Sequence, residues 1–342
     1  MAFITIDLGT TNSKVTIFND NMMELCHASK KVIYQGSGPI VEFDADLYFT
    51  AIMSNISNLV AQLDEPVHQI VLTGQAESLV VLDAECRPLR PAISWMDMRS
   101  TGESEQIKEK FTEGLAYEIT GQPVNTPTWP ITKILWLKKH ENDCFVRAAH
   151  YVLLKDYIQY CLTGVLIGEY SIYNFSYYFD LKKRTYWQDM LDFCSIRRDQ
   201  LPDLTDPCTP IGMLRPDLAS WLGLNKNTLV NCGTLDHFAG MIGTGNIRPG
   251  TISESTGTVL SLATLVDQPV FAGKIPCHYG PFRDSFVLLP VCESGGVSLE
   301  WFRDKYAAEL DYRSIDEQAA TRIRPGEVVF LPFLTGSNSP DF

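Results

Sequence analysis

An acid, a glycine and a run of small polar residues follow directly on the apolar opening of the chain. MAFITI leads into DLGTTNSK, residues 7–14, and VTIF continues after it. Gly9 lets the backbone turn sharply and approach a ligand, and the backbone N–H groups of such a turn can cradle phosphate oxygens. Asp7 cannot itself bind phosphate, but its carboxylate can hold Mg²⁺ through water. An ordinary hairpin turn explains the same residues equally well, and no P-loop pattern occurs in the sequence.

A second acid, Asp236, stands in GTLDHF after the apolar run TLVNC. A carboxylate at the end of a strand can accept the proton of a substrate hydroxyl. Taken alone, the same acid is more commonly a cap for the helix predicted over FAGMIG. Further on, STGT at residues 255–258 predicts another small turn, in which Gly257 and Thr258 supply donors to a phosphate.

Polar side chains suited to a polyhydroxy ligand gather in two segments, GQAES at residues 74–78 and SWMDMR at residues 94–99. Carboxylates, amides and an aromatic wall together satisfy the hydroxyl groups and the apolar face of a sugar or polyol. Without further context, a salt-bridged surface loop is an equally good explanation. The residues concerned are Gln75, Glu77, Trp95, Asp97 and Arg99.

These groups must be positioned by a sheet and helices, which the hydrophobic periodicity predicts. Three successive extended runs predict an antiparallel unit, and Asp44 predicts the N-cap of a long amphipathic helix. A helix that crosses over to a new strand implies a mixed sheet covered by helices. The expected strands span residues 3–6, 15–18, 25–33 and 68–73, a hairpin covers 79–89, and residues 100–225 are expected to be mainly helical.

The opening of the chain resembles a later stretch, since ITIDLGTTNSKVTIF and TISESTGTVLSLATL both predict strand, a Gly-Thr turn and strand again. Such a duplication suggests two related domains that face each other across a cleft. The sequence ends at GEVVFLPFLTGSNSPDF, where an apolar strand and a Pro-Phe-rich loop would leave buried backbone unpaired. We therefore expect the last part of the second domain to be absent from this chain.

Composition excludes several classes of protein. The chain has 342 residues, enough for two domains, and a net charge of -13, which argues against non-specific binding to nucleic acid or an anionic membrane. No apolar run is long enough to span a bilayer, and no signal peptide is evident. The nine cysteines are scattered without metal-like spacing, which predicts reduced thiols in a cytoplasmic protein.

In this order and spacing, the segments resemble the FGGY family of carbohydrate kinases, and most of all its xylulokinase-like members. DLGTTNSK is similar to the first phosphate motif of the family, GQAES to SWMDMRS resembles its sugar-site segment, and GTLDHFAGMIGTGNIRPGTISESTGT resembles its catalytic G-x-x-D-Q stretch and second phosphate loop. The resemblance runs through the whole chain. It implies α/β domains of the actin/hexokinase-like (ribonuclease H-like) kind, with mixed five-stranded sheets flanked by helices. Residues 1–243 would form the first domain, and residues 244–342 would begin an incomplete second domain.

The resemblance also assigns roles to individual residues and implies ATP and Mg²⁺ as cofactors. It makes Asp236 the catalytic base and Asp7 the acid that organises the metal. The first phosphate loop would comprise Gly9, Thr10, Thr11, Asn12, Ser13 and Lys14, the second Gly257 and Thr258, and the sugar side Gln75, Ala76, Glu77, Trp95, Asp97, Arg99 and His237.

Two positions depart from the family pattern. Residue 237 is His where many members have Gln, and Ala76-Glu77 stands where xylulokinases usually have Met-His, which is closer to the glycerol-kinase pattern. The second departure puts xylulose in doubt. The adenosine motif of the family would lie beyond residue 342, so this chain alone is expected to hold ATP poorly.

The resemblance implies transfer of the γ-phosphate of ATP to a hydroxyl of a small sugar or polyol, with a xylulose-like ketose favoured. The alternative from another class is a non-catalytic sugar-binding or sensor protein of the same fold. An actin- or chaperone-like ATPase needs no sugar pocket, and the polar residues around Trp95 argue against it. We expect a small sugar or polyol as the partner, neither nucleic acid nor membrane, and a homodimer as the candidate assembly.

Overall fold

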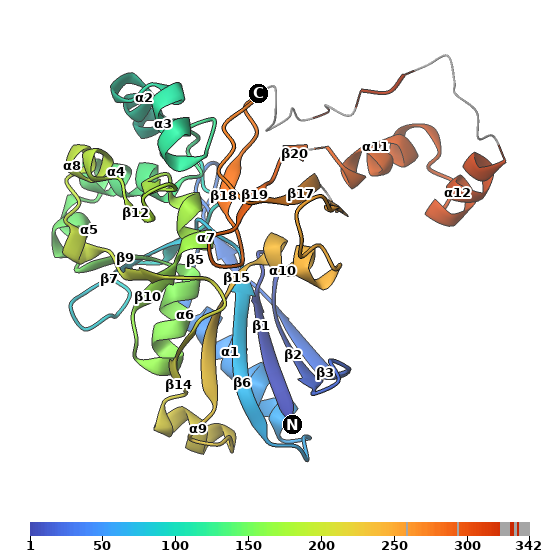
Figure 1. The fold of residues 1–342 in the computed structure, drawn as a ribbon, viewed down its shortest axis with the longest axis horizontal. Coiled ribbons are helices and arrows are strands. Elements are labelled where there is room, and N and C mark those ends of the chain that lie inside the picture. Colours follow the sequence, from blue (N-terminus) through green and yellow to red (C-terminus); the bar gives the residue numbers. More distant parts are fainter. Residues whose placement is uncertain (258, 293, 322–328, 332–333, 335–342) are drawn as a thin grey trace.

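The computed structural model describes residues 1–257, 259–292, 294–321, 329–331 and 334. Figure 1 shows a larger region built on the sheet that begins at the N-terminus, and a smaller region that follows α10 (Asp236–Gly243) and leads toward the C-terminus. The strand and loop predicted for GEVVFLPFLTGSNSPDF fall mostly outside the described residues.

The larger region is organised by a six-stranded sheet in the order β14-β15-β6-β1-β2-β3. The first three strands of the chain are antiparallel neighbours, so the predicted three-stranded unit is confirmed. β6 lies parallel to β1, and β15 lies parallel to β6. These five strands form the predicted mixed sheet, and β14 adds an antiparallel sixth strand at its edge. The bounds are β1 Ala2–Leu8, β2 Asn12–Asn19, β3 Glu24–Lys31, β6 Val67–Gly74, β14 Pro210–Met213 and β15 Leu229–Leu235.

Two helices cover one face of this sheet. α1 (Ala45–Val60) begins at the predicted N-cap, where the side chain of Asp44 accepts a hydrogen bond from the Leu47 N–H at 2.9 Å. α1 packs on β2 and β3, whereas α6 (Leu154–Thr163) packs on β6 and β15. The two helices also contact each other, which places them on the same face. Burial of the apolar stripes of both helices against the sheet is the main stabilising term for this region.

The predicted hairpin at residues 79–89 is confirmed, because Leu82 pairs with Pro88 across a turn. Its first strand, β7 (Leu79–Leu82), pairs along its full length with β9 (His150–Leu153) in another sheet, of order β4-β5-β8-β7-β9. The region from 100 to 225 is mainly helical with short strands, as predicted. The remaining bounds are β4 Tyr34–Gln35, β5 Glu42–Phe43, β8 Ala92–Ile93, α2 Thr101–Lys110, α3 Glu113–Thr120, α4 Pro130–His140, α5 Asn142–Arg147, β10 Ile167–Glu169, α7 Tyr170–Tyr173, β11 Phe179–Asp180, β12 Thr185–Tyr186, α8 Gln188–Cys194, β13 Asp203–Thr205 and α9 Pro216–Leu222.

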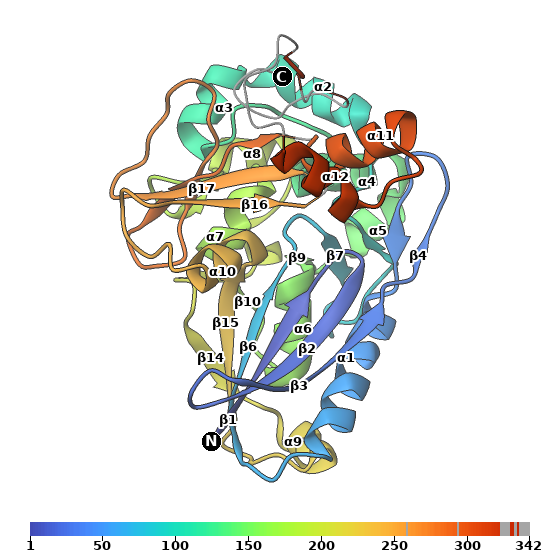
Figure 2. The ribbon, with the colours of Figure 1, turned by 90° about the vertical axis from the view of Figure 1, so that its right-hand side faces the viewer.

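The smaller region opens with a second strand–turn–strand hairpin, β16 and β17, as the internal similarity predicts. In both views of the ribbon this hairpin lies beyond α10, away from the first sheet (Figures 1 and 2). β17 pairs further with β19 and β20, so its sheet is antiparallel throughout the described strands. The bounds are β16 Ile252–Thr256, β17 Leu260–Val266, β18 Cys277–Tyr279, β19 Phe286–Leu288, β20 Val291–Cys292, α11 Gly296–Tyr306 and α12 Tyr312–Ala320.

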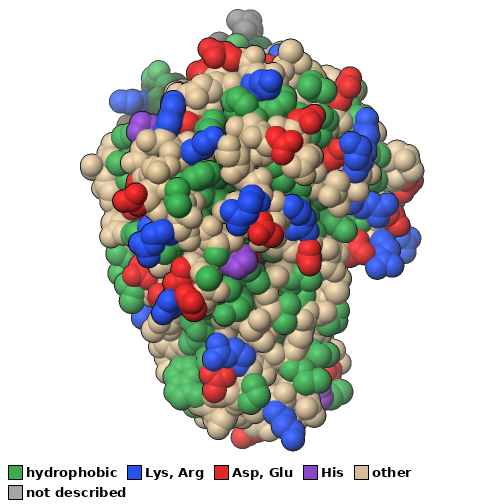
Figure 3. Space-filling view, turned by 90° about the vertical axis from the view of Figure 1, so that its left-hand side faces the viewer, with side chains coloured by type: hydrophobic (Ala, Val, Ile, Leu, Met, Phe, Trp, Pro, Cys, Tyr) green, Lys and Arg blue, Asp and Glu red, His purple; other side chains and the backbone are tan. Residues whose placement is uncertain are grey.

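Acidic and basic side chains are interspersed on the face of the molecule that Figure 3 shows, so this face carries no continuous basic surface for nucleic acid. Among the helices that the structure describes, none is both long and apolar enough to cross a bilayer. The buried cysteines Cys194, Cys232 and Cys277 are thiols outside any disulfide, as predicted.

Gly233 creates a bulge in β15 just before Asp236. The pairing of β15 with β6 shifts between Asn231 and Thr234, and Gly233 has a φ of 58°. A Cβ atom at Gly233 would lie 1.6 Å from the carbonyl oxygen of Leu72. Only glycine therefore allows the two strands to approach here.

We expect Gly233→Ala to destabilise the protein by about 3 kcal/mol or more, because the left-handed backbone and the overpacking each cost about 1–3 kcal/mol. Urea unfolding would measure the loss. Gly114→Ala is the matched control, since a Cβ atom at Gly114 in α3 meets nothing within 4 Å. Equal stability of the two variants would contradict this account of the bulge.

Candidate functional site

Three parallel strands end at one edge of the first sheet. Leu8 at the end of β1 pairs with Gly74 at the end of β6, and Gly74 also pairs with Leu235 at the end of β15. The residues that follow these strand ends must therefore lie close together (Figure 1). The shared register brings the turn after Asp7, the segment GQAES and Asp236 to one place.

Hydrogen bonds from two tyrosine side chains hold the turn after β1. The hydroxyls of Tyr48 and Tyr34 donate to the carbonyl oxygens of Gly9 at 3.0 Å and Thr10 at 2.8 Å, respectively. Gly9 is required here, because a Cβ atom would lie 2.5 Å from the carbonyl oxygen of Asn12. These two hydrogen bonds fix the carbonyl groups of the turn, and the binding of phosphate oxygens by its N–H groups stays a prediction.

The other residues of the first phosphate segment divide into two groups. The side chains of Thr11, Asn12 and Lys14 are exposed, so they are accessible to a ligand. Ser13 is buried, and its hydroxyl donates to the Lys30 carbonyl at 3.4 Å within the pairing of β2 and β3. Its side chain therefore stabilises the hairpin, and only its backbone remains for the predicted role.

Trp95 joins the predicted sugar side to the first turn. Its indole Nε1–H donates to the Thr10 hydroxyl at 2.9 Å, and its backbone N–H donates to the Ser78 hydroxyl at 3.2 Å. Ser78 in turn donates to the amide oxygen of Gln75 at 2.7 Å. Gln75 and Ala76 are both buried. The segments GQAES and SWMDMR thus form one unit with the turn after β1.

Asp97 and Arg99 form a buried ion pair that lies behind Trp95. The Asp97 side chain is fully buried, accepts from the Val41 N–H at 2.6 Å and binds the Arg99 guanidinium at 2.7 Å. Arg99 also binds Glu42 at 2.5 Å. Both side chains direct their polar atoms into the protein, so the structure gives them a supporting position, and direct contact with sugar stays a prediction.

Glu77 lies within electrostatic range of Asp236 and Lys133, in an unfavourable environment for negative charge. Burial, together with the charge of Asp236, raises the pKa of Glu77 to about 8, although the cation of Lys133 opposes this shift. Its backbone is left-handed, with a φ of 69°. The Lys133 ammonium is buried and donates to the carbonyl oxygens of Ser94 at 2.8 Å and Thr128 at 2.6 Å.

Asp236 is the first residue of α10, and its carboxylate accepts from the His237 N–H at 2.7 Å. The helix-cap alternative is therefore not borne out, because Leu235 holds the N-cap position and α10 has no side-chain cap hydrogen bond. The Asp236 carboxylate is instead partly buried and lines a cavity. Burial raises the pKa of Asp236. Burial also raises the pKa of Asp7, and the negative charge of Asp236 adds to that shift, whereas Lys14 opposes it. The two acids are thus close enough to repel each other.

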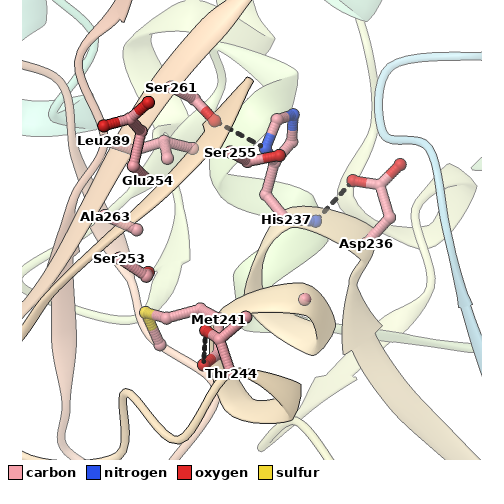
Figure 4. A pocket seen from close by; sticks show the side chains of 11 residues that line it. Asp236, His237, Met241, Thr244, Ser253, Glu254, Ser255, Ser261, Ala263 and Leu289 are labelled. Carbon is pink, nitrogen blue, oxygen red and sulfur yellow. Dashed lines mark hydrogen bonds between the residues drawn. The ribbon is translucent and has the colours of Figure 1, made fainter. Parts of the chain in front are cut away.

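The cavity beside Asp236 has a volume of about 320 Å³ and separates α10 from the hairpin of β16 and β17 (Figure 4). Asp236 and His237 line one side, and Ser255 and Ser261 line the other. The His237 Nδ1 atom lies 3.4 Å from the Ser261 hydroxyl, so this histidine links the two sides. The cavity thus adjoins the second hairpin and Asp236, and a cleft that also includes the first hairpin stays a prediction.

The second predicted phosphate loop is only partly described. Gly257 is exposed and directly follows β16, and its N–H donates to the Val259 carbonyl at 2.9 Å. Thr258 lies outside the described residues. Gly257 therefore stands next to the cavity wall that carries Ser255, while the role of Thr258 stays a prediction.

The acids of the site fit a magnesium ion bound mainly by water and phosphate. No cluster of three or more His, Cys, Asp or Glu suited to a metal occurs in the part of the chain that the structure describes. Mg²⁺ in phosphoryl-transfer sites is held by one or two carboxylates together with substrate oxygens. The partly buried Asp7, whose negative charge is disfavoured without a cation, suits that arrangement.

Several residues of the site carry no signal in the linear sequence. Tyr34 and Tyr48 support the first turn, and Lys133 lies behind Glu77, yet each comes from a segment without a recognisable motif. Only the pairing of distant strands and helices brings them together. A buried lysine in the apolar helix ITKILWL was the one available hint.

Comparison with known proteins agrees with this geometry. The model of the FGGY family of carbohydrate kinases, N-terminal domain, matches residues 2–243. The chain is 30% identical over 348 residues to xylulose kinase of Bacillus subtilis, covering 98% of this chain and 68% of that protein. It is 26% identical over 350 residues to gluconokinase of Bacillus licheniformis, with the same coverage.

Solved structures give the same result. The ligand-bound xylulose kinase from Lactobacillus acidophilus superposes with a TM-score of 0.92 at 27% identity, over 99% of this chain and 70% of that one. Gluconate kinase from Lactobacillus acidophilus gives a TM-score of 0.92 at 26% identity, with the same coverage. The predicted fold class is confirmed, and the likeness does not separate the two kinds of kinase.

Glu77 makes stability depend on pH. A carboxyl whose folded pKa is raised stabilises the protein below its ordinary value near 4.5, and this contribution is lost as pH rises through about 8. We therefore expect the free energy of unfolding to fall between pH 5 and pH 8, and Glu77→Gln to reduce that fall. Urea unfolding at both pH values measures it, with the exposed Glu109→Gln as control. An unchanged pH dependence in Glu77→Gln would contradict the assignment.

Proposed function

The chain belongs to the FGGY family of carbohydrate kinases, and we propose that Asp236 is the base by which it transfers the γ-phosphoryl group of ATP to a hydroxyl of a neutral sugar or polyol. As a member of this family it is an ATP-dependent sugar kinase. One observation carries the proposal: the common ending of β1, β6 and β15 places Asp236 between the turn after Asp7 and the hairpin of β16 and β17.

Phosphoryl transfer passes through a loose transition state, so catalysis depends mainly on positioning and on neutralising charge. The hydroxyl of the acceptor would lie against Asp236, which takes its proton as the new bond to the γ-phosphorus forms and the bond to the β-phosphate oxygen breaks, so that ADP leaves. The N–H groups of the turn at Gly9 and the hydroxyl-rich turn at Gly257 would hold the phosphate oxygens from opposite sides. Approach of the two hairpins would exclude water from the cavity.

Magnesium, when bound, would neutralise charge on the phosphates of ATP. Asp7 is the residue that would hold it, through water as Mg²⁺ prefers. The exposed ammonium of Lys14 lies near enough to Asp7 to oppose the rise of its pKa. Lys14 is therefore placed to meet a phosphate oxygen on the same side.

The charges of the site favour a neutral acceptor over a sugar acid. Asp7, Glu77 and Asp236 occupy one region, and the charge of Asp236 raises the pKa of both other acids. An aldonate would add a fourth carboxylate to this region. Burial lowers the pKa of Lys133 to about 7, and two carbonyl groups already engage its Nζ atom. Arg99 is likewise engaged by Asp97 and Glu42. We therefore favour a xylulose-like ketose or a polyol, as the sequence predicts.

Other expectations from the sequence remain proposals. We retain the division into a first domain at residues 1–243 and a second that begins at residue 244, a cytoplasmic location and a homodimer. Nothing in the family relationship supports a non-catalytic sensor. Contacts with sugar are proposed for Gln75, Ala76, Glu77, Trp95, Asp97, Arg99 and His237.

We expect Asp236→Asn in the complete gene product to lower turnover by about 10² to 10⁴, since that is the usual contribution of a general base. Sugar affinity should change little, because the amide keeps the shape of the side chain. A coupled assay of ADP release measures turnover, and calorimetry measures sugar binding. Asp189→Asn, in the exposed first turn of α8, is the matched control. Turnover within a few-fold of wild type in Asp236→Asn would rule out the role.

The preference between acceptors can be measured with a panel of ketoses, polyols and aldonates at neutral pH. We expect kcat/KM for a neutral ketose or polyol to exceed that for gluconate by about tenfold or more, the effect of about 1.4 kcal/mol of charge repulsion. Preferred phosphorylation of gluconate would refute the charge argument and leave the kinase assignment intact.

A further inference from the structure

A fully buried ion pair lies behind the end of β15, outside the cavity. The Lys155 ammonium on α6 binds the Glu169 carboxylate at 2.6 Å, and both side chains have no exposed surface. Lys155 also donates to the carbonyl oxygen of Cys232 in β15 at 2.9 Å. Burying two charges costs several kcal/mol each unless good geometry and further hydrogen bonds compensate. Burial of the Lys155–Glu169 pair therefore costs folding free energy, and its further hydrogen bonds show which parts of the structure it supports.

From Glu169 the contacts lead toward the catalytic strand end. Glu169 accepts from the Ser171 N–H at 2.6 Å and from the Ser171 hydroxyl at 2.9 Å. The same hydroxyl lies 2.9 Å from the Thr234 hydroxyl and 3.4 Å from the N–H of Leu235. Leu235 is the residue directly before Asp236.

The end of β15 is also held from its other side. The Thr73 hydroxyl on β6 donates to the Thr234 carbonyl at 2.9 Å. Thr234 follows the bulge at Gly233, where regular pairing with β6 is interrupted. Side-chain hydrogen bonds thus fix the two residues before Asp236 where the strand ladder is irregular.

We propose that Lys155, Glu169, Ser171 and Thr234 form a positioning chain that fixes the Asp236 carboxylate relative to the cavity. The inference rests on the proposed role of Asp236 as the base. None of the four residues lines the cavity, so they act through the backbone of β15. The buried Lys155 cation has a second effect, because its charge opposes the rise in the pKa of Asp236 that burial causes.

Two variants remove single hydroxyls from this chain, Ser171→Ala and Thr234→Val. We expect each to lower kcat by about tenfold to a hundredfold, because small displacements of a catalytic group have effects of that size. The KM for sugar should stay within about twofold, since these residues do not reach the cavity. Thr234→Ser restores the hydroxyl and should recover most of kcat.

Thr228→Val is the matched control at the other end of the same strand. Thr228 is fully buried, and its hydroxyl donates to the Val67 carbonyl at 3.1 Å just before β15 begins. Each kcat is divided by the fraction of folded protein, which thermal unfolding measures. A purely structural role predicts similar losses of stability in Thr234→Val and Thr228→Val and an unchanged kcat in both. That result would overturn the inference, as would an equal loss of kcat in Thr228→Val.

The double variant Asp236→Asn/Thr234→Val separates this inference from the proposed function. If Thr234 acts through Asp236, its substitution should lower kcat little further in the Asp236→Asn background. A fully additive loss would overturn the positioning role. High turnover of the single variant Asp236→Asn would refute the proposed role of Asp236 as the base. If Asp236→Asn is inactive but Ser171→Ala and Thr234→Val have normal kcat, only the positioning chain is refuted.

Discussion

The parallel register of β1, β6 and β15 is the constraint on which the site depends. Leu8, Gly74 and Leu235 occupy matching positions, so the residues that follow them meet at one edge although they are far apart in the sequence. Shifting one strand by one residue would turn every side chain to the opposite face. The buried alternation of β1 and the apolar contacts of α1 and α6 fix that register.

The convergence has an electrostatic consequence. Burial raises the pKa of Asp7, Glu77 and Asp236, and the charge of Asp236 adds to this rise for Asp7 and Glu77. These shifts make the site receptive to cations and to proton transfer. The buried Lys155 and Lys133 lie behind the acids rather than among them, where they moderate the repulsion without blocking the cavity. Burial and repulsion, rather than any single motif, thus give the site its chemical character.

The sequence predicted the strands, the N-cap at Asp44 and the mixed sheet because these depend on local periodicity and capping. It also selected Asp7, Asp236 and Trp95 by their place after strands and their similarity to a family. It did not predict β14 at the edge or the pairing of β7 with β9. The salt-bridge alternative allowed for the local Asp97–Arg99 pair. The sequence did not reveal that Arg99 also binds Glu42, or that Ser171 supports Leu235, because such contacts join segments whose approach no local pattern encodes.

The central claim is that sugar and nucleotide meet between the turn at Gly9 and the hairpin of β16 and β17, with Asp236 at the acceptor hydroxyl. A crystal structure of the complete gene product with a ketose and a non-hydrolysable ATP analogue tests it most directly. The account predicts a sugar hydroxyl within hydrogen-bond distance of the Asp236 carboxylate and the γ-phosphate between the two turns. A sugar bound away from Asp236, or phosphates that contact neither turn, would contradict it.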